Sequence, residues 1–250
     1  MHAVEVDTVA FAFQDRDRTV PVIKNVSFIA DEFEFVSVIG PSGCGKSTLL
    51  RIIAGLIPPT RGKILIYDKE VAKPTELVSF VFQDSALLPW LTNIENVKLS
   101  LSSSPMSEDE KNRKAKAILD RLELKGFENA YPNVLSGGMK QRVGVARAMV
   151  SDPKVLLMDE PFSSLDELTA RSLRSEILST LKDKNLPIMS VLMVSHNVEE
   201  VVELSDKVVI LSDKPSYVKA IKTIDLPVPR DRHSKEFINV VDSIYSVLTG

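Results

Sequence analysis

A glycine-rich segment near residue 40 has the residue types and the spacing that phosphate binding requires. It reads Gly40-Pro41-Ser42-Gly43-Cys44-Gly45-Lys46-Ser47-Thr48 and fits the pattern G-x-x-x-x-G-K-[ST]. Glycine lets the backbone bend so that successive N–H groups point at phosphate oxygens, and a following helix presents its positive N-terminal end to the same anion. Lys46 would supply charge to the β- and γ-phosphates, and the Ser47 hydroxyl is a hard oxygen ligand for Mg²⁺. We therefore predict a nucleoside-triphosphate site here; a glycine turn with an incidental lysine is the alternative.

Cys44 lies inside this loop and is the only cysteine of the chain, so no intrachain disulfide is possible. This cysteine usage fits a reducing compartment. A thiol beside a helix N-terminus can have a lowered pKa and react readily. The interpretation we favour is simpler, namely a small residue that fits the loop.

Two carboxylates follow an apolar run that is typical of a buried strand. Asp159 and Glu160 come directly after residues 155–158. In open α/β sheets, ligands bind at the carboxyl ends of the strands. Asp159 would hold Mg²⁺ there, and Glu160 would polarise a water molecule for attack on the γ-phosphate as a general base. The alternative is that the two acids merely cap a helix. The presence of a phosphate loop in the same chain favours the catalytic interpretation.

A second glycine motif, Leu135-Ser136-Gly137-Gly138, precedes another helical pattern. A hydroxyl and unhindered backbone amides at a helix start form an anion site, although an ordinary serine N-cap explains the residues equally well. One nucleotide rarely needs two such sites. The second site therefore suggests a surface that closes over a nucleotide held by another copy of the chain.

This motif, together with the downstream Gln141 and Arg142, resembles the signature motif of the ABC-type ATPases. The family's remaining motifs occur in the family's order, and the resemblance covers nearly the whole chain. They are Phe13 in place of the adenine-stacking aromatic, Gln83 of the Q-loop, Ser163-Ser164-Leu165-Asp166 of the D-loop, and His196 as the switch histidine.

The resemblance implies a head-to-tail homodimer with two ATP molecules in its interface. The 40–48 loop and Phe13 would bind ATP on one subunit, and Ser136, Gly137 and Gly138 of the other subunit would contact the γ-phosphate. It implies catalytic roles for Glu160, His196, Gln83 and Lys46, Mg²⁺ contacts for Ser47, Gln83 and Asp159, and a contact across the interface for Asp166.

Elements that could position these residues follow from hydrophobic periodicity and cap residues. We predict an edge strand over 4–13 and further strands over 22–28, 33–39, 63–67, 78–82, 155–158, 188–194 and 207–211. We predict helices over 46–54, 93–101, 138–150, 168–185, 197–204 and 234–247, and a long amphipathic helix that opens with the capping box at 107–110.

Apolar runs that alternate with helices favour an α/β fold with a parallel sheet. With the family resemblance, this becomes a P-loop NTPase (RecA-like) core with an N-terminal antiparallel β-subdomain and an inserted α-helical subdomain. We expect one ABC ATPase domain over 1–250, with the nucleotide-binding core over 1–83 and 151–250 and the helical subdomain over 84–150.

Charge and hydropathy exclude several other classes of protein. The chain has 250 residues and a formal net charge of −3, which argues against a nucleic-acid partner. No apolar run reaches the roughly 18 residues that a membrane-spanning helix needs, and the N-terminal residues do not resemble a secretory signal. We expect a protein that lies peripherally on the cytoplasmic face of the cell membrane, held there by partner proteins.

The segment that begins at Gln83 and ends at Val97 contains Leu87-Leu88-Pro89-Trp90. It resembles the importer subgroup for nitrate, sulfonate and taurine-like solutes, whose relatives also move thiamine precursors. That resemblance implies docking to two transmembrane permease subunits near this segment and, indirectly, a solute-binding protein. Packing within the helical subdomain is the alternative role for these apolar side chains.

Other functions remain as alternatives. They are a soluble ABC-type ATPase that is not coupled to transport, an exporter ATPase, and an unrelated P-loop kinase, which should lack the glycine motif at 136–138.

Overall fold

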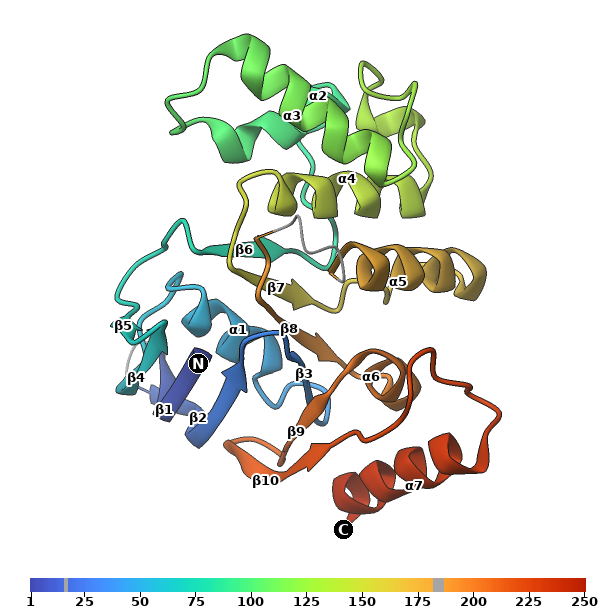
Figure 1. Cartoon of the computed structure of the whole chain (residues 1–250). Coiled ribbons are helices and arrows are strands. Elements are labelled where there is room, and N and C mark those ends of the chain that lie inside the picture. Colours follow the sequence, from blue (N-terminus) through green and yellow to red (C-terminus); the bar gives the residue numbers. More distant parts are fainter. Residues whose placement is uncertain (16–17, 182–186) are drawn as a thin grey trace. The chain divides into compact units, whose positions relative to one another are not determined.

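The computed structural model describes residues 1–15, 18–181 and 187–250. Within these residues the chain forms two compact units (Figure 1). The first unit contains Met1–Thr75 and Met189–Gly250, and the second contains Glu76–Ile188. The predicted division into a core and a helical subdomain over 84–150 stays a prediction. Residues 182–185 of the predicted helix over 168–185 lie outside the described residues.

The N-terminal strands of the first unit are antiparallel. β1 (His2–Asp15) lies between β2 (Arg18–Asp31) and β4 (Arg61–Ile66), and β5 (Lys69–Glu70) pairs with β4. The predicted edge position of β1 is therefore wrong. Its imperfect alternation comes from shifts in register along both of its ladders, near which Thr8 has a φ of 49°.

A mostly parallel set of strands completes the first unit. β3 (Phe35–Ile39) lies between β8 (Ser190–Ser195) and β9 (Lys207–Leu211) and is parallel to both. Every residue of β3 and β8 is buried, as expected for parallel strands that are covered on both faces. β10 (Ser216–Thr223) is antiparallel to β9 and makes a short parallel pairing with β2.

Three helices cover strands of the first unit (Figure 1). α1 (Lys46–Ile53) contacts β8, and α6 (Val198–Leu204) contacts β3 and β8. α7 (Lys235–Thr249) contacts α6 and β9, so the last described helix packs on this unit. The sequence predicted all three helices to within a few residues of their ends.

The second unit combines two parallel strands with helices. β6 (Val78–Val81) pairs with β7 (Val155–Asp159). α2 (Asn93–Lys98), α3 (Glu108–Arg121) and α4 (Gly137–Met149) contact one another, and α4 also contacts β6 and α5 (Glu167–Leu181). Two short 3₁₀ turns occupy Leu99–Leu101 and Pro132–Val134.

The capping box predicted for α3 is present. The Ser107 hydroxyl accepts a hydrogen bond from the Glu110 N–H, and the Glu110 carboxylate accepts one from the Ser107 N–H at 2.8 Å. The predicted helix over 93–101 is shorter than expected, because α2 ends at Lys98 and the last turn is 3₁₀. Such tightening is common where a helix ends.

Candidate functional site

The 40–48 loop joins the end of β3 to the start of α1 in the first unit. Gly45 caps α1 with a φ of 107°, and a Cβ added there would lie 2.7 Å from Val22 Cγ1. A side chain at this position would therefore be strained and would collide with β2. The loop sets the N-terminus of an eight-residue helix directly after a buried parallel strand, which is the arrangement that binds phosphate.

The Lys46 side chain folds back over this loop. Its Nζ donates hydrogen bonds to the Gly40 carbonyl at 2.8 Å and the Pro41 carbonyl at 3.1 Å. Lys46 is 6% exposed, so its charge sits in a place of reduced solvent screening. The two carbonyls are neutral, so these hydrogen bonds do not neutralise the positive charge of Lys46. A bound phosphate could pair with the same ammonium group.

Cys44 is buried in the loop, with 1% of its surface exposed. Burial raises the pKa of the Cys44 thiol, and the nearby Lys46 charge lowers it by less. The hypothesis of a thiol with a lowered pKa is therefore wrong. The favoured interpretation of Cys44 as a small packing residue agrees with this burial.

His196 lies at the same sheet edge as the phosphate loop. β3 and β8 are parallel with Ile39 opposite Ser195, so both strands end at one level. His196 follows directly after β8 and is exposed, and Gly40 follows directly after β3. The structure thus brings together two of the predicted site elements that are 156 residues apart in the sequence.

Phe13 lies on β1, and half of its surface is exposed. Its ring stands edge-on to Phe11 with 4.8 Å between the centroids. Phe11 is opposite Ile23 on β2, next to Val22, the residue that limits Gly45. The Phe13 ring is therefore accessible on the part of the sheet that borders the 40–48 loop.

In the second unit, a chain of hydrogen bonds connects Gln83 to the turn of Glu160. The Gln83 Nε2 donates to Ser163 Oγ at 3.2 Å, and that hydroxyl donates to the Glu160 carbonyl at 3.0 Å. Glu160 has a φ of 45°, an uncommon conformation for a side-chain-bearing residue that occurs often at functional sites. Asp159 precedes it as the buried last residue of β7.

The register of β6 and β7 explains this proximity. Val81 is opposite Met158, so Gln83 and Asp159 follow neighbouring strands at one edge. Sequence reasoning assigned Ser163 only to the D-loop resemblance. A serine four residues beyond Asp159 gave no signal of its bond to Gln83.

The second glycine motif starts α4 in the same unit. Ser136 is the N-cap, and its Oγ accepts a hydrogen bond from the Met139 N–H at 3.3 Å. Ser136 and Gly137 are exposed, so the start of α4 is accessible to another molecule. Asp166 caps α5 by accepting a hydrogen bond from the Thr169 N–H at 3.0 Å. Hydrogen bonds from the Thr169 side chain and backbone lower the pKa of the Asp166 carboxyl.

A model of the family described as ABC transporter matches residues 23–163 of the chain. The chain belongs to the ABC transporter family. It is an ATPase of that family, and the sequence-based identification of ATP as its substrate is confirmed at the level of the family.

Three similarities cover most of the chain. An uncharacterized ABC transporter ATP-binding protein of Methanocaldococcus jannaschii is 42% identical over 98% of this chain and 91% of the relative. The aliphatic sulfonates import ATP-binding protein SsuB of Bacillus cereus is 41% identical over 94% of this chain and 91% of the relative. A solved dimeric ATP-binding cassette bound to ADP and phosphate gives a TM-score of 0.78 at 30% identity, covering 90% of this chain and all of that one.

In this ABC ATPase, the side chains of the buried Asn96 and the half-buried Arg147 hold the segment after Gln83 in place. The Asn96 Nδ2 donates to the carbonyls of Leu88, Leu91 and Thr92 at 3.0–3.1 Å, and its Oδ1 accepts from the Leu88 N–H. Arg147 donates to the Ser85 and Ala86 carbonyls. Sequence analysis missed both residues, although an asparagine on a buried helix face is itself a signal of a specific polar contact.

Trp90 projects from this fixed segment and is 69% exposed. Leu87 and Leu88 are partly buried, so the predicted packing role fits these two side chains better than it fits Trp90. Among the described residues, we find no helix with the length and apolar character needed to cross a membrane.

Proposed function

We propose that this ABC ATPase is the ATP-binding subunit of an importer and works as a head-to-tail homodimer. The observation that carries hydrolysis is the chain Gln83–Ser163–Glu160, because it places an amide and a carboxylate-bearing turn at one strand edge. Solved relatives that are dimeric cassettes support the dimer. Relatives named for sulfonate import and nitrate transport support the importer.

The binding residues follow from the chemistry of each group. Lys46 and the amides of the 40–48 loop would hold the phosphates of ATP, and Phe13 would stack on adenine. The Ser136 hydroxyl and the amides of Gly137 and Gly138 would contact the γ-phosphate bound to the other subunit. These residues, with Gly40, Pro41, Ser42, Gly43, Cys44, Gly45, Ser47 and Thr48, form the proposed nucleotide site.

Three oxygen-bearing side chains have the donor chemistry that a magnesium ion prefers. The Ser47 hydroxyl, the Gln83 amide oxygen and the Asp159 carboxylate are hard ligands of the kind that Mg²⁺ takes. When bound, Mg²⁺ would offset negative charge on the β- and γ-phosphates. Asp159 is 4% exposed at the end of β7, a position where a carboxylate is stabilised by a nearby cation.

Glu160 and His196 would act on the γ-phosphate itself. Glu160 would accept a proton from the attacking water, and Gln83 would orient that water. His196 would donate a hydrogen bond to a γ-phosphate oxygen as negative charge redistributes in the transition state. Lys46 would stabilise the same charge from the loop side.

The membrane partners would dock on the segment that begins at Gln83 and ends at Val97. Two transmembrane permease subunits are the proposed partners, and the protein would lie peripherally on the cytoplasmic face of the membrane. The exposed Trp90 ring is a suitable anchor because aromatic side chains contribute strongly to interfaces. A solute-binding protein would act indirectly through the permease.

The proposed solute is a small nutrient such as nitrate, a sulfonate or taurine, or a thiamine precursor. The relative SsuB of Bacillus cereus is named for aliphatic sulfonates, and NasD of Klebsiella oxytoca, 40% identical, is named for nitrate transport. Their near-equal identity supports the class of importer and does not separate these solutes.

The Glu160→Gln variant tests the proposed hydrolysis and dimer. Turnover should collapse while ATP binding persists, and ATP should then trap a dimer, measured by light scattering against the ATP-free protein. Lys46→Ala serves as the matched control, because it should lose ATP binding and therefore also the dimer. Wild-type turnover by Glu160→Gln would remove Glu160 as the general base.

The alternative is a soluble ABC-type ATPase that is not coupled to transport. Co-expression with candidate permease subunits and purification in detergent separates the two functions. A stable complex that Trp90→Ala weakens supports the importer. Normal ATP-driven dimerisation with no complex for any transmembrane partner supports the alternative.

A further inference from the structure

Helices α4 and α5 of the second unit pack closely against each other at Gly138. A Cβ added to Gly138 would lie 2.2 Å from Thr169 Cγ2, which is far shorter than a contact between non-bonded carbon atoms. Thr169 stands in the first turn of α5, and its N–H is bonded to Asp166. The start of the helix that carries the second glycine motif therefore packs directly on the helix that Asp166 caps.

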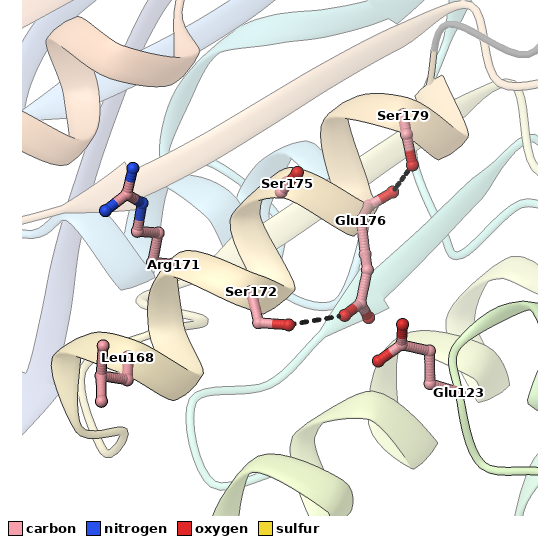
Figure 2. Close-up of a pocket in the computed structure, with 7 residues that line it drawn as sticks. All are labelled: Glu123, Leu168, Arg171, Ser172, Ser175, Glu176 and Ser179. Atoms are coloured by element: carbon pink, nitrogen blue, oxygen red, sulfur yellow. Dashed lines mark hydrogen bonds between the residues drawn. The ribbon is translucent and has the colours of Figure 1, made fainter. Parts of the chain in front are cut away.

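One turn further along α4, Arg142 joins the same two helices by charged contacts. Its Nη2 lies 2.6 Å from Glu176 Oε1 and donates to Ser172 Oγ at 3.1 Å. Ser172 and Glu176 are three and seven residues beyond Thr169, so they share its face of α5. Figure 2 shows Ser172 hydrogen-bonded to Glu176, at 3.0 Å, with the Glu123 carboxylate facing them.

The second terminal nitrogen of the Arg142 guanidinium contacts the residues that follow α3. The Nη1 donates to the Leu122 carbonyl at 3.1 Å and to Glu123 Oε2 at 2.8 Å. The two carboxylates differ in environment, because the Glu176 side chain is 15% exposed and the Glu123 side chain is 67% exposed. Arg142 itself is 11% exposed, so its pairing with Glu176 is the less screened of the two.

We propose that Arg142 is a positioning residue that clamps α4 to α5 and so fixes the Ser136–Gly138 turn relative to the turn of Asp166. This inference rests on the proposed function, in which the Ser136–Gly138 turn contacts the second copy of the chain, and on the contact across the same interface that the family resemblance implies for Asp166. Arginine suits the role because its planar fork can bond two helices at once. Lysine provides the charge without that geometry.

Burial explains why the clamp needs both partners. Burial raises the pKa of the Glu176 carboxyl, and the Ser172 hydroxyl and the Arg142 charge oppose that shift. Removing the arginine leaves a mostly buried carboxylate without its cation, and removing the carboxylate leaves the guanidinium with only the exposed Glu123 as its anion. The exposed Glu123 carries no such penalty.

The experiment compares Arg142→Met and Glu176→Gln with Glu123→Gln, which changes the exposed partner of the same arginine. Each variant is made in the full chain with and without Glu160→Gln. Three quantities are measured: ATP-driven dimerisation by sedimentation, binding of a fluorescent ATP analogue to the monomer, and hydrogen exchange of the Met139 and Thr169 amides.

Arg142→Met and Glu176→Gln should each weaken the ATP-driven dimer about tenfold or more, as expected for a lost charged contact. The Met139 and Thr169 amides should exchange faster, while monomer affinity for the analogue should stay within about twofold, because the phosphate loop lies in the other unit. Glu123→Gln should change all three quantities by less than about twofold. The double variant of Arg142 and Glu176 should be no worse than the poorer single variant.

An unchanged dimer and unchanged exchange in Arg142→Met would overturn the clamp, as would an equal loss in Glu123→Gln. Parallel loss of monomer ATP binding would show a general structural role and would also overturn it. If Glu160→Gln alone does not dimerise with ATP, the proposed function fails. The hydrogen exchange of the Met139 and Thr169 amides in Arg142→Met then shows independently whether Arg142 fixes the two turns. If Arg142→Met does not fold, Arg142→Lys is measured in the same way and should give a smaller loss of the same kind.

Discussion

The Ser195 hydroxyl donates a 3.0 Å hydrogen bond to the carboxylate of Glu200, and both side chains are buried. The same hydroxyl accepts a bond from the Asn197 N–H, and the Asn197 side chain caps α6 through the Glu200 N–H. His196 lies between Ser195 and Asn197. Its backbone is thus fixed on both sides while its imidazole stays exposed.

Removing this hydroxyl should loosen the turn that carries His196. Ser195→Ala takes one bond from a buried carboxylate and one from a backbone N–H, so unfolding free energy should fall by about 1–3 kcal/mol. With His196 less well placed, kcat should fall more than the KM for ATP rises. Urea denaturation and steady-state kinetics measure the two effects.

The control for Ser195→Ala is Ser243→Ala on α7, whose hydroxyl bonds only to a carbonyl in its own helix in the contacts described. Its effect on unfolding should stay within about 0.5 kcal/mol. Wild-type stability and kcat in Ser195→Ala would contradict the role of this bond.

The proposed stacking at Phe13 predicts a loss of nucleotide affinity in Phe13→Ala. Stacking of a base on an aromatic ring contributes about 1–3 kcal/mol, so affinity for ATP should fall by roughly tenfold. Phe33→Ala, which removes another exposed ring, should leave ATP affinity unchanged. Titration calorimetry measures both variants, and equal affinities for wild type and Phe13→Ala would exclude the stacking role.

Cys44 should resist thiol reagents in the folded protein. Its burial hides the sulfur, and its raised pKa lowers the thiolate fraction near neutral pH. Labelling with a chromogenic disulfide should be at least about a hundredfold slower than in the unfolded chain, since it requires local opening. Labelling at the rate of an exposed cysteine would show that the loop opens freely.

The capping box of α2 should make the second unit sensitive to acid. The Thr92 hydroxyl and N–H donate to Glu95 Oε2 at 2.7 Å, and these bonds lower the pKa of the Glu95 carboxyl. A lowered folded-state pKa adds stability above the ordinary glutamate pKa, and this contribution is lost as the pH falls through the lowered value. The melting temperature should therefore drop in that acid range.

Thr92→Ala tests the same cap at neutral pH. It should destabilise the protein by about 1 kcal/mol, the usual cost of losing an N-cap. It should also reduce the fall in melting temperature between neutral and acid pH, because Glu95 then titrates closer to its ordinary value. An unchanged acid profile in Thr92→Ala would contradict the assignment of that sensitivity to Glu95.

Local signals in the sequence predicted most elements correctly. The phosphate loop before α1 and the capping box of α3 depend on residues within a few positions of one another. Motifs of this kind can be recognised from the order of residue types alone. The error at β1 arose because bulges and a free edge disturb the alternation of a strand in similar ways.

The sequence by itself predicted the groups that would carry the chemistry: a phosphate loop, two acids after an apolar run, and a glycine turn that starts a helix. Only the tertiary structure decided which groups meet. The register of Ile39 opposite Ser195, the bond from Gln83 to Ser163 and the contact of Arg142 with Glu176 all join distant segments. Strand register and helix packing depend on burial across the whole unit, so no local pattern of residues specifies them.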